Sequence, residues 1–320
     1  MLILGHDDVL AALSPEECAE AMAAVLGAHA RGEALMPLRS MVPFDGAAGF
    51  MATMPAWRGG DDPVFSLKSL VIAPGNPARG LDTRQETVTL FDGQTGKPRA
   101  ILDATAVTSV RTAAVSAVAT RTLAREDARV LAILGAGVQG RAHLRALPAV
   151  REFDEVRVYS PSVEHARALA DGEAQVAASA EAAVRGADVV VLATTSHEPV
   201  ISRDWLSPGV HVNAVGASVP SACELDTRTV VDCVLFCDSR ESLRNEAGEF
   251  RLAVEDGVIA GEDHVRGELG EVLAGIAPGR TDAEELTVFR SLGLAVEDLA
   301  AAERAVALAW ARGIGVEVVL

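Results

Sequence analysis

The stretch LAILGAGVQG, residues 131–140, decides the fold of the second half of the chain. An apolar run is followed by Gly135, Gly137 and Gly140, and a helical pattern continues to about residue 147. In a strand–turn–helix context the first glycine permits a tight turn, the second lets the backbone approach a pyrophosphate, and the third lets helix and strand pack closely. The helix N-terminus adds unpaired N–H groups and a positive dipole end. We therefore expect a dinucleotide-binding turn; the alternative is a tight turn that binds nothing.

The same alternation of strand, turn and helix repeats downstream. Near-continuous Val, Ile and Leu runs between short helical segments are typical of a parallel sheet covered on both faces. We expect an α/β fold with a Rossmann-type doubly wound parallel sheet over 114–289. Its further strands are expected in EVRVYS (155–160), AQVAA (174–178), DVVVLATT (188–195), GVHVNAVG (209–216) and CVLFCDS (233–239).

The first part of the chain has a different pattern. Ser14, Pro15 and Glu17 form a capping-box signature that predicts a helix ending near Gly32. Short β-like runs separated by Gly, Pro and Asp turns fill residues 36–103. They include FDGQTGKPRAILD, which we expect to form a hairpin with its turn at 93–96, and an Ala-rich helix should follow over 104–125. This pattern indicates an α+β domain.

The C-terminal stretch VFRSLGLAVEDLAAAERAVALAWARG, residues 288–313, has the spacing of one long amphipathic helix. The first domain lacks an obvious last element, so we expect this helix to return and complete it. The expected domains are therefore 1–113 with 290–320, and 114–289.

Composition excludes several classes of partner. The chain has 320 residues, of which 49% are hydrophobic, and a formal net charge of −17. Such acidity argues against nucleic acid and against an anionic membrane surface. The N-terminus does not resemble a secretory signal and no apolar run reaches membrane length, so we expect a cytoplasmic protein. Four cysteines without zinc-type spacing fit buried, inert thiols and no metal site, with Cys233 and Cys237 on one face of a strand.

The end of the second strand bears on the choice of nicotinamide cofactor. An acid there would bind the ribose hydroxyls of NAD, but the chain has Ser160, Pro161 and Ser162. Glu155 stands at the wrong end of that strand. The missing acid removes repulsion against a 2′-phosphate and so favours NADP, although no Arg stands beside the serines and NAD stays open.

Three cations stand in apolar segments of this acidic chain, namely Arg39, Lys68 and Arg111. Each by itself could be an ordinary solvated or snorkelling side chain. Together they resemble a site for a carboxylate, because Arg can bind two oxygens at once and Lys adds a point charge.

Three segments, RTAAVSAVATRTLA (111–124), NAVGASVPSACELD (213–226) and TVFRSLGLAVEDLAAAE (287–303), together with the glycine loop, resemble the ornithine cyclodeaminase/mu-crystallin family. The resemblance spans nearly the whole chain, with the motifs in the family's order. It implies a homodimer in which an N-terminal substrate and dimerisation domain, joined by the C-terminal helix, carries an inserted Rossmann domain. Members of the family include cyclodeaminases, alanine dehydrogenases and reductases of cyclic ketimines.

The resemblance also implies roles for individual residues. Arg39, Lys68 and Arg111 match residues that hold the substrate carboxylate, with Arg111 also near the cofactor. Thr83 and Arg84 match positions that contact substrate or cofactor near the nicotinamide, although Arg84 departs from the His of mu-crystallin-like members. The remaining cofactor positions are Gly135, Gly137, Val138 and Gln139 at the pyrophosphate, Ser160, Pro161 and Ser162 at the adenosine ribose, Thr194, Thr195, Ser196, Val215 and Ser218 near the nicotinamide, and a closing segment of Ser291, Leu292 and Gly293.

The residue at position 218 separates the reactions. The resemblance assigns a carboxylate there as the base of the cyclodeaminases, and a carboxylate can take an ammonium proton and stabilise an iminium ion. A serine does this poorly, and the GAS sequence is that of mu-crystallin-like ketimine reductases. Glu224 and Asp226 are interpreted as caps of the next helix rather than as replacements for the acid.

The sequence therefore predicts an NAD(P)H-dependent reductase of a small cyclic 2-imino acid, of the pyrroline- or piperideine-2-carboxylate type. Lys68, Arg111 and Ser218 are the expected catalytic residues. Three alternatives stay open: an ornithine cyclodeaminase that recycles NAD, an alanine-dehydrogenase-like enzyme, and a protein that binds NADP and a small aromatic carboxylate without turnover.

Overall fold

The computed structural model describes residues 1–44, 49–216 and 219–319. The chain forms two compact units, which are described separately. Unit 1 comprises Met1–Arg111 and Leu294–Leu320, and unit 2 comprises Thr112–Gly293. The division falls within helix α3 (Ala104–Leu123).

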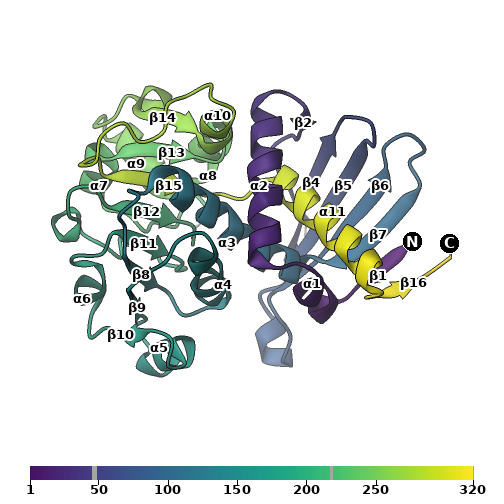
Figure 1. Ribbon diagram of the computed structural model, residues 1–320, viewed down its shortest axis with the longest axis horizontal. Helices are drawn as coiled ribbons and strands as arrows, with labels where there is room; N and C mark the ends of the chain where they lie inside the picture. Colours follow the sequence, from purple (N-terminus) through teal and green to yellow (C-terminus); the bar gives the residue numbers. More distant parts are fainter. Residues whose placement is uncertain (45–48, 217–218, 320) are drawn as a thin grey trace. The chain divides into compact units, whose positions relative to one another are not determined.

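Unit 1 is built on a mainly antiparallel sheet (Figure 1). The strand order is β16-β1-β7-β6-β5-β4-β2, with β3 also paired to β4, and β1 runs parallel to β7. Strands β6 and β7 form the predicted hairpin, and its predicted turn at residues 93–96 lies between the end of β6 and the start of β7. The strands are β1 (Leu2–Leu4), β2 (Ala34–Leu35), β3 (Ser40–Pro43), β4 (Phe50–Arg58), β5 (Val64–Ile72), β6 (Arg84–Asp92), β7 (Pro98–Asp103) and β16 (Val316–Glu317).

Three helices, α1 (His6–Ala12), α2 (Pro15–Ala30) and α11 (Ala295–Arg312), belong to the same unit. Helix α2 begins with the predicted capping box, in which Ser14 and Glu17 exchange side-chain and backbone hydrogen bonds. Helix α11, yellow in Figure 1, runs across β4, β5 and β6 and packs beside α2. The inward-facing positions of the strands, such as Val88 and Leu90, are buried. The C-terminal helix thus packs on the sheet of a unit whose other elements, apart from β16, come from the first third of the chain.

The opposite face of this sheet, here called the outer face, carries apolar side chains that are exposed in the described part of unit 1. Strand residues alternate between faces, so one set of positions points away from α11. Phe65 is 47% exposed, and Ile3, Met51 and Val71 are each between 38% and 39% exposed. Side chains of this size on the outside of a sheet are typical of a surface that another protein covers.

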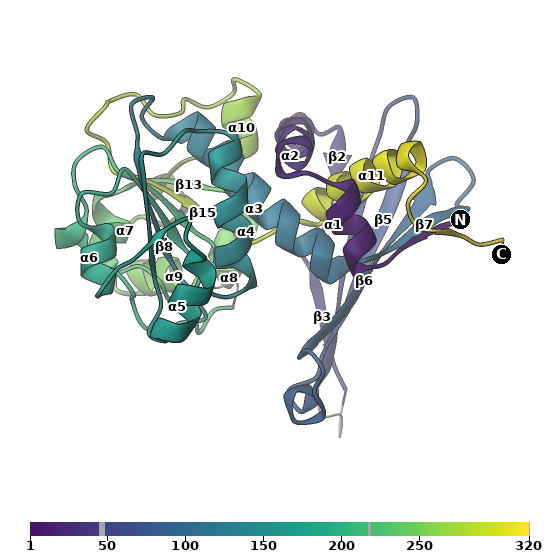
Figure 2. The ribbon, with the colours of Figure 1, turned by 60° about the horizontal axis from the view of Figure 1, so that its bottom comes forward.

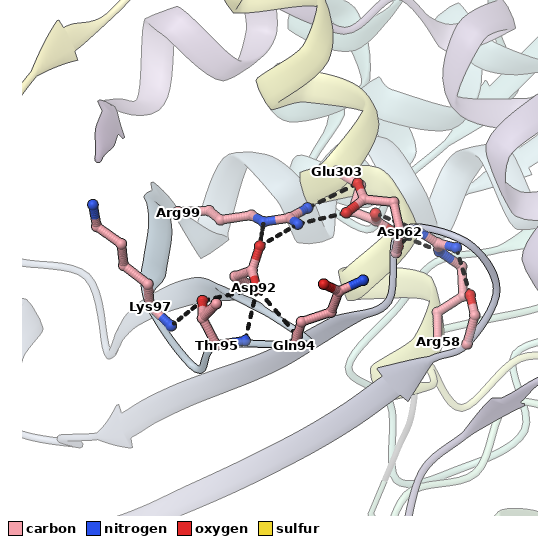
Figure 3. Close-up of polar contacts among 9 residues, drawn as sticks. Arg58, Asp62, Asp92, Gln94, Thr95, Lys97, Arg99 and Glu303 are labelled. Carbon is pink, nitrogen blue, oxygen red and sulfur yellow. Dashed lines mark hydrogen bonds and ion pairs between the residues drawn. The ribbon is translucent and has the colours of Figure 1, made fainter.

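An ion-pair network ties the loops of unit 1 to α11 (Figure 3). Arg99 donates to Asp92 at 2.6 Å and to Asp62, which joins the β6–β7 and β4–β5 turns. Arg58 makes two hydrogen bonds, at 2.8 and 2.9 Å, to the carboxylate of Glu303 on α11. All five side chains are partly solvated, so each pair contributes only ~0–1 kcal/mol to stability.

Unit 2 contains the expected doubly wound sheet, and every strand pairing in it is parallel. The order is β10-β9-β8-β11-β12-β15-β13-β14. The strands are β8 (Val130–Leu134), β9 (Glu155–Tyr159), β10 (Gln175–Val176), β11 (Val189–Leu192), β12 (His211–Ala214), β13 (Val234–Cys237), β14 (Val265–Glu268) and β15 (Thr287–Arg290); the helices are α4 (Val138–Ala146), α5 (Val163–Ala170), α6 (Ala180–Val184), α7 (Thr227–Asp232), α8 (Arg240–Glu246), α9 (Gly248–Glu255) and α10 (Leu269–Leu273).

Both faces of this sheet are buried under helices. On β8, Leu131 and Ile133 pack with residues of α4 and α5, whereas Ala132 and Leu134 pack with residues of α6 to α9. Figure 2 shows α4 on one side of β8 and α6 and α7 on the other. This double coverage explains why the strands read as continuous apolar runs rather than as alternating ones.

The prediction of one helix over 288–313 is wrong at its start. Residues Thr287–Arg290 form β15 in the interior of the sheet, and helix α11 begins only at Ala295. Gly293, with φ of +82°, lies between them and ends any continuous helical path. The apolar residues 288 and 289 fit a helical period by coincidence, since four buried residues are too few to distinguish strand from helix. Strand β14 was also missed, because VRGE carries no β-type alternation.

The four cysteines are free thiols and all are buried, as predicted. Cys233, however, ends helix α7 and precedes β13, so it does not share a strand face with Cys237. Within the described ranges no three His, Cys, Asp or Glu side chains are grouped so as to hold a metal ion. In those same ranges, no helix combines the length and the apolar character that a membrane crossing requires.

Candidate functional site

The glycine turn between β8 and α4 has the geometry that its sequence predicts. Gly135 has φ of +110°, and a Cβ there would overlap the carbonyl oxygen of Ala193. A Cβ at Gly140 would overlap the carbonyl oxygen of Gly135, so helix and turn are in direct backbone contact. Gly137 is different, because a Cβ on it would meet no atom within 4 Å. Nothing in the structure crowds that position, so the space beside it is available to a ligand.

A cavity of about 580 Å³ lies against this turn and within unit 2. Seven of the residues predicted to bind the cofactor contribute to its lining, from the ends of three adjacent parallel strands. A crevice at the carboxyl ends of such strands is where dinucleotides bind in doubly wound folds. The seven are Gly135, Gly137, Ser160, Pro161, Thr194, Thr195 and Ser196, and the other lining residues are Leu134, Ala136, Tyr159, Ala180, Ala193 and Val200.

The first turn of α4 suits an anionic group. Gly137 is its N-cap and offers no side chain to the helix N–H groups. Val138 and Gln139 are the first helical residues, and Val138 is largely exposed. Uncapped N–H groups at a helix start, with the dipole behind them, bind phosphate. The residues present at this turn therefore fit the pyrophosphate of a nicotinamide dinucleotide.

The carboxyl end of β9 carries no acid. Ser160 and Pro161 face the cavity, while the hydroxyl of Ser162 accepts a hydrogen bond from the N–H of His165 and caps α5. Glu155 is the first residue of β9, at the opposite end, where it forms an ion pair with Arg157. The side chains at the expected ribose position thus offer hydroxyls rather than negative charge.

Glu224 joins the two loops that follow β11 and β12 in unit 2, which corrects its interpretation as a helix cap. Its carboxylate accepts hydrogen bonds from the N–H and hydroxyl of Thr194 and from the N–H of Gly216, each at 2.8 Å. Asp226 is the residue that caps α7. Burial is the main influence on Glu224 and raises its pKa to about 7, although Arg290 opposes that rise.

The closing segment is held by a second buried acid. Oδ2 of Asp238, at the end of β13, accepts hydrogen bonds from the N–H groups of Leu292, at 2.5 Å, and Gly293, at 2.7 Å. Burial raises the pKa of Asp238 against the effect of these N–H groups. Ser291 is buried beside them, and the N–H of Val215 is bonded to the carbonyl of Leu192. Backbone and carboxylate together therefore fix the positions of 215 and 291–293.

In unit 1, the structure brings Lys68 and Arg111 to one carboxylate. Nζ of Lys68 lies 3.3 Å from Oδ1 of Asp298, and Nε of Arg111 donates to the same oxygen at 3.0 Å. Arg111 also donates to Glu297 at 2.9 Å. Lys68 comes from β5, Arg111 from α3, and both acids from the first turn of α11. Two of the three cations predicted from their apolar surroundings, Lys68 and Arg111, are thus buried together.

The charges in this cluster shift one another's pKa. Burial lowers the pKa of Lys68, which the charge of Asp298 only partly offsets. Burial also disfavours the ionised form of Asp298, but Lys68 and Arg111 outweigh it and hold the Asp298 pKa below its usual range. Asp298 is therefore an anion, and Lys68 loses its proton more readily than an exposed lysine does.

A third carboxylate, Glu86, completes the cluster. It lies on β6, opposite Leu70 of β5, and its side chain is only 2% exposed. Its Oε1 accepts a hydrogen bond from the hydroxyl of Thr108 at 3.3 Å, and its Oε2 lies 3.7 Å from Nζ of Lys68. Thr108 in turn accepts a hydrogen bond from Lys68 at 2.5 Å. The cluster thus contains Lys68, Arg111, Glu86, Glu297 and Asp298.

Three further residues predicted for the site, Arg39, Thr83 and Arg84, also belong to unit 1. Arg39 is half-buried and immediately precedes β3. Thr83 accepts a hydrogen bond from the N–H of Ala73 through its carbonyl and immediately precedes β6. Arg84 is exposed, and its charge contributes to lowering the pKa of Lys68. Ser218 lies outside the described residues.

The model of the ornithine cyclodeaminase/mu-crystallin family matches residues 2–309. The chain belongs to this family. Ketimine reductase mu-crystallin from Mus musculus is 38% identical over 275 residues, which are 85% of this chain and 84% of that protein. Delta(1)-pyrroline-2-carboxylate reductase of Thermococcus litoralis, solved with NADH and L-proline, is 34% identical with a TM-score of 0.92 and covers 99% of this chain and 100% of its own. An archaeal alanine dehydrogenase, solved as a dimer with bound NAD, is also 34% identical with a TM-score of 0.92, and the match covers 100% of this chain and 99% of that one.

Several polar residues of this family member were missed by sequence reasoning. Glu86 shares its strand phase with buried Val88 and Leu90, so its position in the apolar alternation was a usable signal. Glu297 and Asp298 stand in an apolar helical segment, and this position was a weaker signal. Asp238, Glu249 and Arg290 have no feature in the neighbouring sequence that marks them as site residues. Arg290, for example, contacts Glu249 at 2.6 Å, and the two residues lie on elements that are distant in sequence.

Proposed function

We propose that this protein is an NAD(P)H-dependent reductase of a small cyclic 2-imino acid, of the pyrroline- or piperideine-2-carboxylate type. The observation that carries the proposal is the buried pair of cations, Lys68 and Arg111, bonded to Asp298. Relatives with reductase names, one of them solved with NADH and L-proline, support the same chemistry.

The pair suits the carboxylate of such a substrate. An ammonium has three N–H donors and a guanidinium has five, so Lys68 and Arg111 can bind a substrate carboxylate in addition to their bonds with Asp298 and Glu297. Burial strengthens these charge-assisted bonds, because little water competes for them. Arg39 and Thr83 are proposed as further substrate contacts.

The cofactor is proposed to bind in the cavity of unit 2, where it supplies the hydride for the C=N bond. The pyrophosphate is assigned to Gly135, Gly137 and the first N–H groups of α4. The adenosine ribose is assigned to the end of β9, and the nicotinamide to the loops that Glu224 and Asp238 hold. The residues proposed to contact the cofactor are Thr83, Arg84, Arg111, Gly135, Gly137, Val138, Gln139, Ser160, Pro161, Ser162, Thr194, Thr195, Ser196, Val215, Ser218, Leu292 and Gly293.

NADPH is proposed as the preferred reductant. The hydroxyl of Ser160 and the absence of acid among 160–162 leave nothing to repel a 2′-phosphate. Comparing kcat/KM with NADPH and with NADH tests this point directly. A preference for NADPH is expected, and a tenfold preference for NADH would contradict it.

The decisive experiment separates reductase from cyclodeaminase. We expect NADPH consumption with pyrroline- or piperideine-2-carboxylate, and no proline or ammonia from ornithine with catalytic NAD. Robust proline formation from ornithine would contradict the reductase proposal. Activity with pyruvate plus ammonia, and with none of the other substrates, would indicate the alanine dehydrogenase reaction. Nucleotide binding with no turnover of any of these compounds would indicate a binding protein.

A homodimer and a cytoplasmic location complete the proposal. The apolar outer face of the unit 1 sheet, with Met51, Phe65 and Val71, is of the kind that a second copy covers, and a solved relative is described as a dimer. Free buried thiols fit a reducing compartment. Light scattering on the purified protein should give twice the mass of one chain. The Phe65→Glu variant should give the mass of a single chain.

A further inference from the structure

Glu86 has a position that the proposed function does not yet use. Its side chain is almost completely buried and faces the same side of the sheet as Lys68. Its Oε1 accepts from Thr108, but among the described residues its Oε2 accepts no hydrogen bond. A buried carboxylate oxygen without a donor is costly when ionised, so its presence needs a chemical explanation.

The charge balance of the cluster points to a proton. Glu86, Glu297 and Asp298 are three carboxylates, and Lys68 and Arg111 are the two buried cations. With every group ionised, the cluster holds one more negative than positive charge. A substrate carboxylate would add another negative charge, which a buried site disfavours strongly. One of the three acids can relieve this excess by holding a proton.

The contacts indicate which acid it is. Asp298 contacts both cations, which keep its pKa low, and Glu297 accepts a 2.9 Å hydrogen bond from Arg111. Glu86 lies farther from a cation, at 3.7 Å from Lys68, and bonds otherwise to the neutral hydroxyl of Thr108. Its strand carries two other charged residues: Arg84, which is exposed to solvent that screens its charge, and Asp92, an acid at the far end of the strand that is paired with Arg99. Of the three acids, Glu86 is therefore the one that can hold a proton at the lowest cost in free energy.

The shape of the substrate places its nitrogen near this acid. In a 2-imino acid the C=N carbon carries the carboxylate, so the nitrogen lies two bonds from the carboxylate carbon. A group that receives the nitrogen must then lie next to the groups that receive the carboxylate. Glu86 meets this condition through its contact with Lys68, one of the two proposed carboxylate ligands.

We propose that Glu86 is the general acid of the reduction, taking the role for which position 218 offers only a serine. This inference rests on the proposed function. Glu86 donates the proton on its carboxyl group to the imine nitrogen, whose lone pair forms the new N–H bond. The resulting iminium carbon accepts the hydride of NAD(P)H, and the electron pair of the C=N bond returns to nitrogen. The substrate is reduced to the cyclic amino acid, the nicotinamide is oxidised, and the Glu86 carboxylate regains a proton from water.

The test is Glu86→Gln, which keeps the shape and the oxygen that accepts from Thr108 but cannot give up a proton. We expect kcat with a cyclic 2-imino acid to fall by about 10²- to 10⁴-fold, the usual contribution of a general acid. The KM for the imino acid should change by less than about threefold, since the carboxylate ligands remain.

Glu86→Asp provides the second variant, because it retains a carboxyl group and should recover part of kcat. Glu303→Gln, a neutralised acid on α11 outside the cluster, should match the wild type in kcat and in KM. Thermal unfolding of each variant establishes that it is folded. A Glu86→Gln enzyme with a wild-type kcat would overturn the inference. So would a folded variant in which only KM changes, because that result indicates a structural charge partner.

The two proposals fail in different ways. If the wild-type enzyme reduces no cyclic imino acid with either nicotinamide, the proposed function is wrong. If the wild type reduces one and Glu86→Gln does so equally well, only the role of Glu86 is wrong.

Discussion

Nε of Arg111 donates a hydrogen bond to Oδ1 of Asp298 at 3.0 Å, which joins residues 187 positions apart in the chain. Both side chains are at most 7% exposed. Lys68 reaches the same oxygen from β5. One carboxylate thus holds two buried cations, and the proposed substrate site depends on it.

Asp298→Asn should destabilise the fold strongly. The substitution leaves Lys68 and Arg111 buried with less compensating charge, and breaking a buried ion pair in this way costs ~3–5 kcal/mol. Glu303→Gln on the same helix breaks the partly solvated pair with Arg58 and should cost no more than ~1 kcal/mol. Urea unfolding of the two variants measures the difference. Equal losses would show that the buried pair carries no special weight.

Lys68→Met and Arg111→Met should each abolish most substrate turnover, and Lys68→Met should leave nucleotide binding intact. Both residues belong to unit 1, whereas the glycine turn and its cavity belong to unit 2. Losing a charge-assisted hydrogen bond should lower kcat/KM by about 100-fold, or ~1.5–3 kcal/mol. The Kd of the Lys68→Met variant for NADPH, followed by its fluorescence, should change by less than about threefold. A large loss of NADPH affinity in this variant would contradict the assignment of Lys68 to the substrate.

Two alanine substitutions in the glycine turn should affect different properties: one should lower stability and the other should lower nucleotide affinity. Gly135→Ala forces a side chain into a positive-φ conformation against Ala193 and should lower stability by at least ~1–3 kcal/mol. Gly137→Ala meets no protein atom, so its stability should stay within ~0.5 kcal/mol of the wild type. Its new methyl group occupies the space proposed for the pyrophosphate, so the Kd for NADPH should rise about tenfold or more, ~1.4 kcal/mol. Unchanged nucleotide affinity in Gly137→Ala would place the pyrophosphate elsewhere.

Glu224 should make stability depend on pH. Its pKa rises from 4.5 to about 7 on folding, so the folded state holds the proton more tightly than the unfolded state. This contribution to stability is complete below pH 4.5 and is lost as the pH rises towards 7, a loss of ~3 kcal/mol.

Glu224→Gln should remove that part of the pH dependence and lower stability at pH 5. An amide has only one carbonyl oxygen, so its NH2 group must face either Thr194 or the N–H of Gly216. Urea unfolding at pH 5 and pH 7.5 provides the measurement, with Glu303→Gln as the control that keeps the wild-type difference. A pH difference that persists in Glu224→Gln would assign it to another group.

Much of the architecture could be read from local patterns. The turn at 135–140 can be recognised from its glycine spacing. The steric overlap that a side chain would cause there depends on neighbours within the same turn and in the adjoining strand. The apolar runs from 130 onwards indicate a sheet covered on both faces for an equally local reason. The central strand β15 could not be recognised, because a buried four-residue strand has no period of its own, and its identity depends on β12 and β13 on either side.

The sequence by itself determined that Lys68 and Arg111 stand in apolar surroundings and that position 218 has a serine instead of an acid. Only the tertiary structure decided which acids accompany them, because Glu86, Glu297 and Asp298 reach the cations from a neighbouring strand and from a helix near the other end of the chain. Electrostatic balance inside a protein depends on distances between side chains, and residues far apart in sequence share those distances only after the chain has folded.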